Sequence, residues 1–129
     1  MAGRCQIGQA TGDKLRTARR HDNAHLDFIR SLPCIRCGND IETEAAHIRM
    51  ADARIAKPIT GIGIRPDDRF VLPMCSRHHR EQHAAGNERQ FWQVTSGLDP
   101  IIYALALHSV TGDFRAGTEI IQAALRLQR

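Results

Sequence analysis

Two pairs of sulfur and nitrogen ligands constrain the fold of this sequence more than any other feature. In the first pair Cys34 and Cys37 are separated by two residues, and in the second pair Cys75 and His78 repeat that spacing. A tight turn of this length can direct both side chains of a pair at one ion, so the two pairs together supply four ligands for a closed tetrahedral Zn²⁺ site. The segment between the pairs is longer than in common zinc fingers, so it is expected to carry elements of its own.

Two alternatives apply to these ligands. His79 is adjacent to His78 and could replace it as the fourth ligand. The first pair could also be two ordinary buried thiols or a thioredoxin-like redox motif. Such a redox motif follows a strand and begins a helix, whereas Pro33 precedes this pair and Gly38 follows it. The sequence therefore favours zinc, and Cys5, which stands alone near the N-terminus, is interpreted as an uninvolved thiol.

The second pair lies in the segment MCSRHHREQH, residues 74–83, which contains three histidines. The Arg, Glu and Gln residues near its end favour a helix, in which each residue advances about 100° around the axis. On such a helix the second pair occupies one stripe, while His79 and His83 occupy another stripe about a quarter-turn away. One helix can thus serve two sites, although two histidines at this spacing are also typical of a solvated helix face.

The net charge of +4 is confined to the part of the chain that holds these ligands. Residues 1–89 contain fifteen Lys and Arg against eleven Asp and Glu, whereas residues 90–129 contain three of each. Such a surplus favours a polyanion such as nucleic acid as partner, although it can also serve solubility alone.

No apolar run approaches the roughly 20 residues of a membrane span, and the N-terminus lacks the apolar core of a secretory signal. The sequence thus predicts a cytoplasmic protein without membrane contact, in which closely spaced thiols are metal ligands or redox groups.

The pattern of the chain predicts an α+β fold in three regions. Residues 1–20 form a flexible basic arm, or else a plain disordered tail, because Lys and Arg cluster there in a Gly-rich polar stretch. Residues 21–96 form a small metal-pinned core, and residues 97–129 form a helical extension that packs on it. The apolar faces of the extension suit either the core or a dimer interface. The expected elements are a helix from Asp22 to before Pro33, strands within 41–50 and 69–74, a helix from about 75, a helical segment at 88–94, and helices at about 100–110 and 117–127.

The motifs LPCIRCG, EAAHIR and LPMCSRHHREQH follow one another in this order, accompanied by RPDDRFVLP and ERQFW. Together they resemble the HNH endonucleases, which have a ββα-metal fold, and specifically a phage-type branch that includes recombination-associated nucleases and DUF968 proteins. The resemblance covers about residues 25–95. It implies a metal-dependent endonuclease of phage or prophage origin that hydrolyses phosphodiester bonds, with DNA as partner and a recombination protein as a further candidate partner.

The resemblance implies a role for each matching residue. His47 in EAAHIR matches the general base, which takes a proton from water for in-line attack on the phosphodiester. His79 and His83 match the helical histidines that hold a catalytic divalent ion, Mg²⁺ or another, which stabilises charge on the phosphate and on the leaving 3′ oxygen. The two ligand pairs match the structural zinc of a subgroup in which that ion ties the hairpin to the helix.

Two positions depart from the family pattern. The residue before the base is often a His or Asp metal ligand, but here it is Ala46, so the catalytic ion has fewer protein ligands. The Asn that orients the base in the family would fall near Phe70. Asp67 or Asp68 must therefore orient His47 or supply the missing ligand, and Asp68 is the favoured residue.

Basic side chains around these motifs are candidates for the phosphate path. They are Arg49, Arg54, Lys57, Arg65, Arg69 and Arg77, although any one of them can equally be a solvated charge.

Two other functions compete with the nuclease. One is a zinc-stapled DNA-binding or recombination accessory module that keeps the fold and lacks cleavage, an alternative that Ala46 supports because the family often has a metal ligand at this position. The other is a thiol oxidoreductase that uses Cys34 and Cys37 without zinc.

Overall fold

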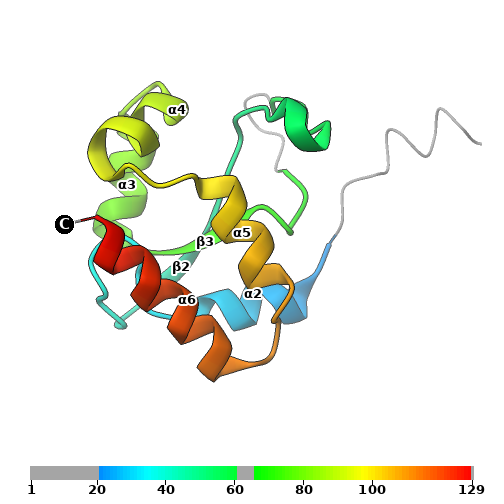
Figure 1. The fold of residues 1–129 in the computed structure, drawn as a ribbon, viewed down its shortest axis with the longest axis vertical. Coiled ribbons are helices and arrows are strands. Elements are labelled where there is room, and N and C mark those ends of the chain that lie inside the picture. The colour runs from blue at the N-terminus through cyan, green and yellow to red at the C-terminus, as the bar shows by residue number, and fades with distance from the viewer. Residues whose placement is uncertain (1–20, 61–65, 129) are drawn as a thin grey trace, which may run out of the picture.

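The computed structural model of the chain describes residues 21–60 and 66–128 (Figure 1). The expected basic arm at 1–20, with Cys5, lies outside the described residues, as does Arg65. The described part is α+β, as the sequence predicted. In chain order its elements are α2 (Asn23–Arg30), β2 (Thr43–His47), the 3-10 turn η1 (Ala53–Ile55), β3 (Val71–Cys75), α3 (Ser76–Ala84), α4 (Glu88–Gln90), the π-helical turn η2 (Phe91–Ser96), α5 (Pro100–His108) and α6 (Phe114–Leu127).

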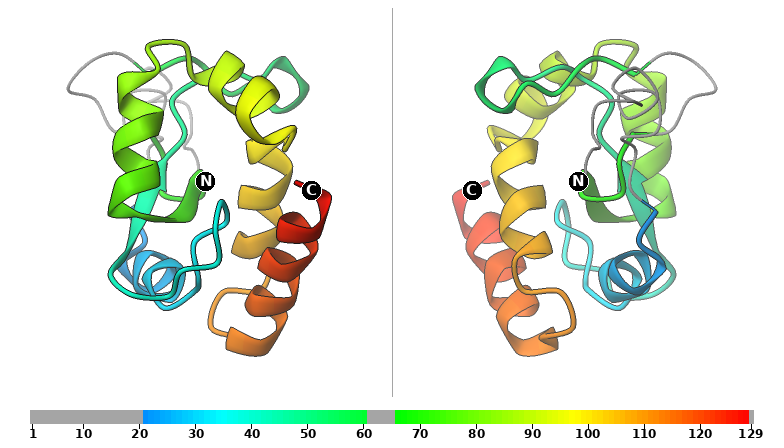
Figure 2. Two further views of the ribbon diagram at one scale, coloured as in Figure 1. Left: turned by 90° about the vertical axis from the view of Figure 1, so that its left-hand side faces the viewer. Right: turned by 90° about the vertical axis from the view of Figure 1, so that its right-hand side faces the viewer.

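A two-stranded antiparallel sheet connects the helices of the fold. β2 pairs with β3 in a register that sets Thr43 opposite Cys75 and His47 opposite Val71. Every residue of β3 is buried, because α2, α3 and α5 all contact this strand. Figure 2 shows α3 on one flank of the molecule and α5 with α6 on the other. Since α3 follows β3 without a loop, the hairpin and this helix form one continuous unit.

α2 begins and ends where the sequence predicted. The Asp22 side chain caps its first turn by accepting the His25 N–H at 3.0 Å. The helix ends before Pro33, whose ring cannot continue the helical hydrogen-bond pattern. Leu26 and Ile29 on one face of the helix are buried in the core. Local capping and periodicity therefore suffice to specify this element.

α6 begins earlier than the sequence predicted, at Phe114 rather than at Gly117. Asp113 caps the helix, because its side chain accepts the Ala116 N–H at 3.1 Å. Glycine is a poor helix former, but at this position it allows close packing. A Cβ on Gly117 would lie 2.8 Å from Cζ of Phe28 on α2. The last helix therefore packs directly on α2, and the glycine belongs to the helix interior.

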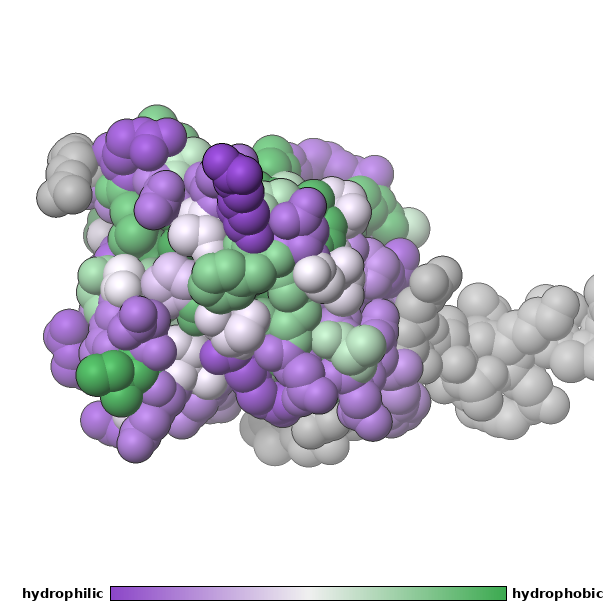
Figure 3. All heavy atoms as spheres, turned by 90° about the horizontal axis from the view of Figure 1, so that it is seen from below, coloured by the Kyte–Doolittle hydropathy of each residue, from purple (hydrophilic) through white to green (hydrophobic). Residues whose placement is uncertain are grey.

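The apolar stripe of α6 faces the core of the chain. Ile121 and Ala124 are buried in it, whereas Phe114 and Leu127 at the two ends of the helix are exposed. Figure 3 shows hydrophobic side chains interspersed with hydrophilic ones on the face seen from below. The apolar stripe of α6 thus forms part of the core of the chain.

His25 is a fully buried titratable residue on α2. The Thr111 hydroxyl donates to the His108 carbonyl at 2.8 Å, so its oxygen accepts the Nδ1–H of His25 at 2.7 Å. Among the residues that the structure describes, none bonds to His25 Nε2. Burial, with a smaller contribution from His108, lowers the pKa of His25 to about 4. The fold therefore accommodates the neutral imidazole, because a second N–H would be buried without an acceptor.

Acid is expected to destabilise the protein through His25. The pKa returns to its ordinary value of about 6.5 on unfolding, so the unfolded chain binds this proton more tightly. The stabilising contribution is complete above pH 6.5 and is lost as the pH falls through 4. At about 1.4 kcal/mol for each pKa unit, the free energy of unfolding should fall by roughly 3 kcal/mol.

Urea unfolding of the parent and of His25→Gln across this pH range measures the effect. Any zinc loss in acid affects both proteins. The difference between the slopes of their free energies of unfolding against pH therefore isolates the contribution of His25. Identical slopes would show that another group controls the acid response.

Candidate metal centre and histidine groove

Cys34, Cys37, Cys75 and His78 converge on one point, as the sequence predicted. One ligand atom from each lies within 4.8 Å of all the others. The sulfurs of Cys37 and Cys75 are 3.9 Å apart, and Nδ1 of His78 is 3.3 Å from Sγ of Cys75. A tetrahedral Zn²⁺ with Zn–S bonds of about 2.3 Å would set two sulfurs roughly 3.8 Å apart. The four side chains therefore fit a metal ion such as structural zinc, with His78 rather than His79 as the fourth ligand.

Two local turns deliver these ligands. The first pair lies in a knuckle in which Cys34 donates its N–H to the Asn39 carbonyl at 2.9 Å and Gly38 donates to the Cys34 carbonyl at 2.8 Å. Gly38 has a φ of 79°, a left-handed conformation that glycine adopts without strain. Ile35 fastens the knuckle to β3 by donating its N–H to the Pro73 carbonyl at 2.9 Å. The second pair lies where β3 ends and α3 begins, so an ion held by both pairs would join the knuckle to the hairpin and the helix.

Burial shifts the pKa of two of these four ligands, whereas hydrogen bonds from neighbouring groups lower the pKa of Cys75. Burial raises the pKa of the Cys34 thiol to about 11, so without a cation this thiol keeps its proton at neutral pH. It also lowers the pKa of His78, which keeps the Nδ1 lone pair available for coordination. Metal binding would therefore release thiol protons. A redox pair needs a thiolate of low pKa, so the raised pKa of Cys34 favours the metal centre over the oxidoreductase alternative.

His47 and Asp68 are in direct contact. His47 ends β2, and its Nε2 lies 2.9 Å from Oδ1 of Asp68. The Asp68 side chain is 1% exposed, and its Oδ2 accepts the backbone N–H of Asp22 at 2.8 Å. Asp67, the alternative orienting residue, pairs with Arg69 at 3.3 Å. A buried carboxylate anchored in this way holds the ring of His47 in one orientation.

His79 and His83 contact each other on α3. Their Nε2 atoms are 3.1 Å apart, and their ring planes meet at 78°. Nδ1 of His79 lies 2.7 Å from Oε1 of Glu44, which comes from β2. α3 therefore presents His78 to the metal centre and the other two histidines to a second cluster, in agreement with the two stripes that its helical spacing predicted.

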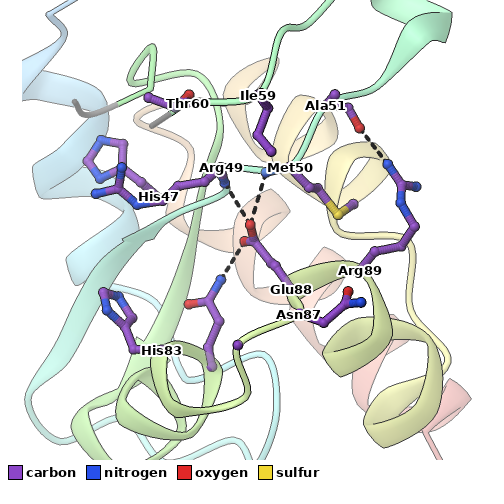
Figure 4. Close-up of a pocket in the computed structure, with 12 residues that line it drawn as sticks. His47, Arg49, Met50, Ala51, Ile59, Thr60, His83, Asn87, Glu88 and Arg89 are labelled. Carbon is purple, nitrogen blue, oxygen red and sulfur yellow. Dashed lines mark hydrogen bonds between the residues drawn. The ribbon is translucent and has the colours of Figure 1, made fainter. Parts of the chain in front are cut away.

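An open groove of about 730 Å³ adjoins His83, whereas His79 does not line it (Figure 4). His47 from β2 and His83 from α3 line it together. Arg49, just after β2, and Arg89, in α4, line it as well. The groove thus brings two imidazoles and two guanidinium groups to one surface.

Glu88 connects the two walls of this groove, as Figure 4 shows. Its Oε1 accepts the backbone N–H groups of Arg49 and Met50, both at 2.9 Å. Its Oε2 accepts the side-chain amide of Gln82, on α3, at 2.7 Å. Since Arg49 lies two residues after His47, the carboxylate ties the segment that follows His47 to the helix that carries the other histidines.

The other predicted basic residues of the phosphate path have different surroundings. Arg69 pairs with Asp67, and its guanidinium lies 5.0 Å from the ring centroid of Phe70. Arg77 pairs with Glu81 at 3.6 Å and lines a smaller hollow beside the metal centre. Of the six basic residues predicted for the phosphate path, Arg49 is thus the one that the described residues place in the groove.

Arg54 and Lys57 stabilise the loop after β2 instead of lining the groove. Arg54 pairs with Asp99 at the start of α5, with 2.9 Å between Nη2 and Oδ2. Lys57 is buried, and its Nζ donates to the Met50 carbonyl at 2.7 Å. Burial also lowers the pKa of Lys57. Composition alone could not separate these structural cations from those that reach the groove.

Sequence reasoning missed Glu44, Gln82, Glu88 and Arg89. Glu88 and Arg89 belong to the motif ERQFW, which marked the segment without assigning a role. Glu44 lies three residues before His47, but its partner is 35 positions further along the chain. Such contacts depend on how β2 packs against α3, which a local pattern does not encode.

The structure and its ligand cluster define an α+β protein with a candidate metal centre beside a histidine-lined groove. Residues 13–108 match DUF968, a family described as a protein of unknown function. Because this match spans more than half of the chain, the protein belongs to the DUF968 family. No curated protein and no solved structure matches the chain. None of the helices in the described ranges combines the length and the apolar character that a bilayer crossing requires.

Proposed function

We propose that this protein is a metal-dependent DNA endonuclease of the HNH type that hydrolyses phosphodiester bonds. The observation that carries the proposal is the His47–Asp68 pair at an open groove, because a general base needs an oriented imidazole that substrate can reach. The order of elements supports it as well. The antiparallel β2–β3 pair leads directly into α3, which is the ββα order that the sequence resemblance implies.

In the proposed reaction His47 takes a proton from the attacking water. A carboxylate accepts hydrogen bonds, so the contact with Asp68 places the ring hydrogen of neutral His47 on Nε2. The lone pair then lies on Nδ1, the atom that takes the water proton. Asp68 stabilises the imidazolium that results, and the N–H of Asp22 keeps the carboxylate in place.

His79 and His83 are the proposed ligands of the catalytic divalent ion. Their Nε2 atoms, 3.1 Å apart, fit two ligands of one ion, because nitrogens at about 2.1 Å and at right angles are roughly 3.0 Å apart. If Mg²⁺, Mn²⁺ or a related ion were bound by these two residues, it would stabilise the charge on the phosphate and on the leaving 3′ oxygen. The protein positions the two imidazoles on α3, beside the groove that His47 lines.

Arg49 and Arg89 suit a polyanionic substrate. Both line the groove, and contacts from such side chains to phosphates position nucleic acid without reading its sequence. The Arg89 guanidinium also donates to the Ala51 carbonyl at 2.7 Å, which places it against the loop after β2. The groove therefore suits the phosphodiester backbone as the group that is bound.

A second function is a DNA-binding or recombination accessory module without cleavage. Ala46, where the family often has a metal ligand, is 1% exposed and packs in the core. The protein therefore offers two imidazoles from α3 and no side-chain ligand from this strand position. Retention of the catalytic ion is the point at which the two functions differ.

Plasmid nicking separates them. The zinc-loaded protein is expected to bind DNA without added divalent ions and to convert supercoiled plasmid to the nicked form only with Mg²⁺ or Mn²⁺. His83→Ala should keep zinc and DNA affinity but require more of the divalent ion, because one imidazole ligand is missing. DNA binding without nicking under either ion would favour the accessory module and overturn the nuclease proposal.

A further inference from the structure

We infer that Glu44 is a positioning residue that orients His79 for binding a divalent metal ion. The inference rests on the two-histidine site of the proposed function and adds to it a residue that the sequence motifs did not mark. Glu44 lies in β2, three residues before His47, and His79 lies in α3. The strand that carries the proposed base therefore also contacts a proposed metal ligand.

The contact with Glu44 fixes the tautomer of His79. Oε1 of Glu44 lies 2.7 Å from Nδ1 of His79, which is the distance of a charge-assisted hydrogen bond. Because an ionised carboxylate has no proton to donate, Nδ1 carries the ring hydrogen and the lone pair of the neutral ring lies on Nε2. Metal-ligating histidines commonly bind a carboxylate through the remote nitrogen, which fixes the ring orientation and makes the ligand nitrogen more basic.

His83 contributes the second nitrogen of this site. Its Nε2 lies 3.1 Å from Nε2 of His79, with the rings edge to face at 78°. Nitrogen ligands about 2.1 Å from one ion are separated by roughly 3.0 to 3.4 Å in octahedral or tetrahedral coordination. Both nitrogens can therefore bind the same ion with little movement of either ring.

A four-residue spacing does not by itself produce such a site. His21 and His25 are also four residues apart, but His21 precedes α2, and His25 is fully buried with its Nδ1 bonded to Thr111. The Glu44 and His79 side chains, by contrast, are 48% and 23% exposed. Exposed ion pairs contribute little to stability, so a variant at Glu44 is expected to fold normally and to report on metal binding.

Ni²⁺ binding to the zinc-loaded protein tests this role, because imidazole ligands suit Ni²⁺ better than Mg²⁺. Isothermal titration calorimetry should show one Ni²⁺ site in the parent and a Kd about 10- to 100-fold higher for Glu44→Ala, the usual effect of losing the carboxylate partner of a ligating histidine. Glu44→Gln should lose less Ni²⁺ affinity than Glu44→Ala, because its amide oxygen still accepts the Nδ1–H of His79. His83→Ala should lose the Ni²⁺ site. Glu119→Ala removes an exposed carboxylate on α6 and should bind as the parent does.

Equal Ni²⁺ affinity of the parent and Glu44→Ala would overturn the role of Glu44, as would a parent with no Ni²⁺ site besides the zinc centre. The zinc content and thermal melt of each variant check that the fold is intact. Plasmid nicking by the same preparations reports separately on the proposed function. A parent that binds Ni²⁺ in a Glu44-dependent way but does not nick DNA would retain this inference and lose the nuclease proposal.

Discussion

Replacing Cys37 with serine is expected to abolish tight zinc binding and to lower the free energy of unfolding by several kcal/mol. Structural zinc contributes roughly 10 to 16 kcal/mol of binding free energy in small zinc-binding peptides, and that energy stabilises the folded state. Cys37 is exposed, so serine leaves no cavity and the loss reports the missing ligand. Elemental analysis and urea unfolding measure the two effects.

The loss is expected to reach beyond the metal centre, because the knuckle also contacts the end of α6. Gln128, just after α6, donates its side-chain amide to the Ile35 carbonyl at 2.7 Å. Ile35 in turn donates its N–H to the Pro73 carbonyl on β3. A knuckle without its ion would loosen both contacts, so the edge of the sheet and the end of α6 should lose protection from hydrogen exchange together.

Cys5→Ser provides the matched control, because it makes the same chemical change at a thiol outside the described residues. It should retain one zinc per chain and melt with the parent. A chelator should bring the parent to the stability of Cys37→Ser. If Cys37→Ser kept its zinc and its stability, the four-ligand centre would be wrong.

The metal centre could be predicted from the sequence because each half of it is local. The two-residue spacing of each pair is enough to aim its side chains at one ion. The choice of His78 over His79 also follows from helix geometry, once α3 begins directly after Cys75. Capping by Asp22 and the stop at Pro33 likewise specify α2 within a short segment.

The groove could not be predicted in the same way, because its contacts join distant positions. Glu88 reaches Arg49 across 39 positions, and Glu44 reaches His79 across 35. These pairs form only when β2, α3 and α4 are packed, and carboxylates are too common for charge alone to select the partners. Asp67 and Asp68 are both candidates from the sequence, because the Asn of the family pattern would fall near Phe70. The structure places Asp68 against His47 and Asp67 against Arg69.

Replacing His47 with alanine is expected to lower the rate of DNA nicking by about 10²- to 10⁴-fold, the usual effect of losing a positioned general base. Alanine leaves the buried Asp68 without one hydrogen-bond partner and should lower the free energy of unfolding. His47 lies at the end of β2 away from Thr43 and Cys75, so the metal centre should stay intact. Zinc content and DNA affinity should therefore match those of the parent. Single-turnover nicking, a binding isotherm and a thermal melt on each protein measure these three properties.

Asp68→Asn gives the sharper test, because it keeps the size of the side chain and changes its hydrogen bonding. Asp68 accepts from both His47 Nε2 and the Asp22 N–H, whereas an Asn amide has one acceptor oxygen and presents its NH₂ to the other partner. If the NH₂ faces His47, the ring hydrogen moves to Nδ1 and the lone pair no longer faces the water. Nicking should then fall well below that of the parent while zinc is retained. If His47→Ala and Asp68→Asn both nicked as fast as the parent, this pair would have no part in cleavage and the nuclease proposal would lose the observation that carries it.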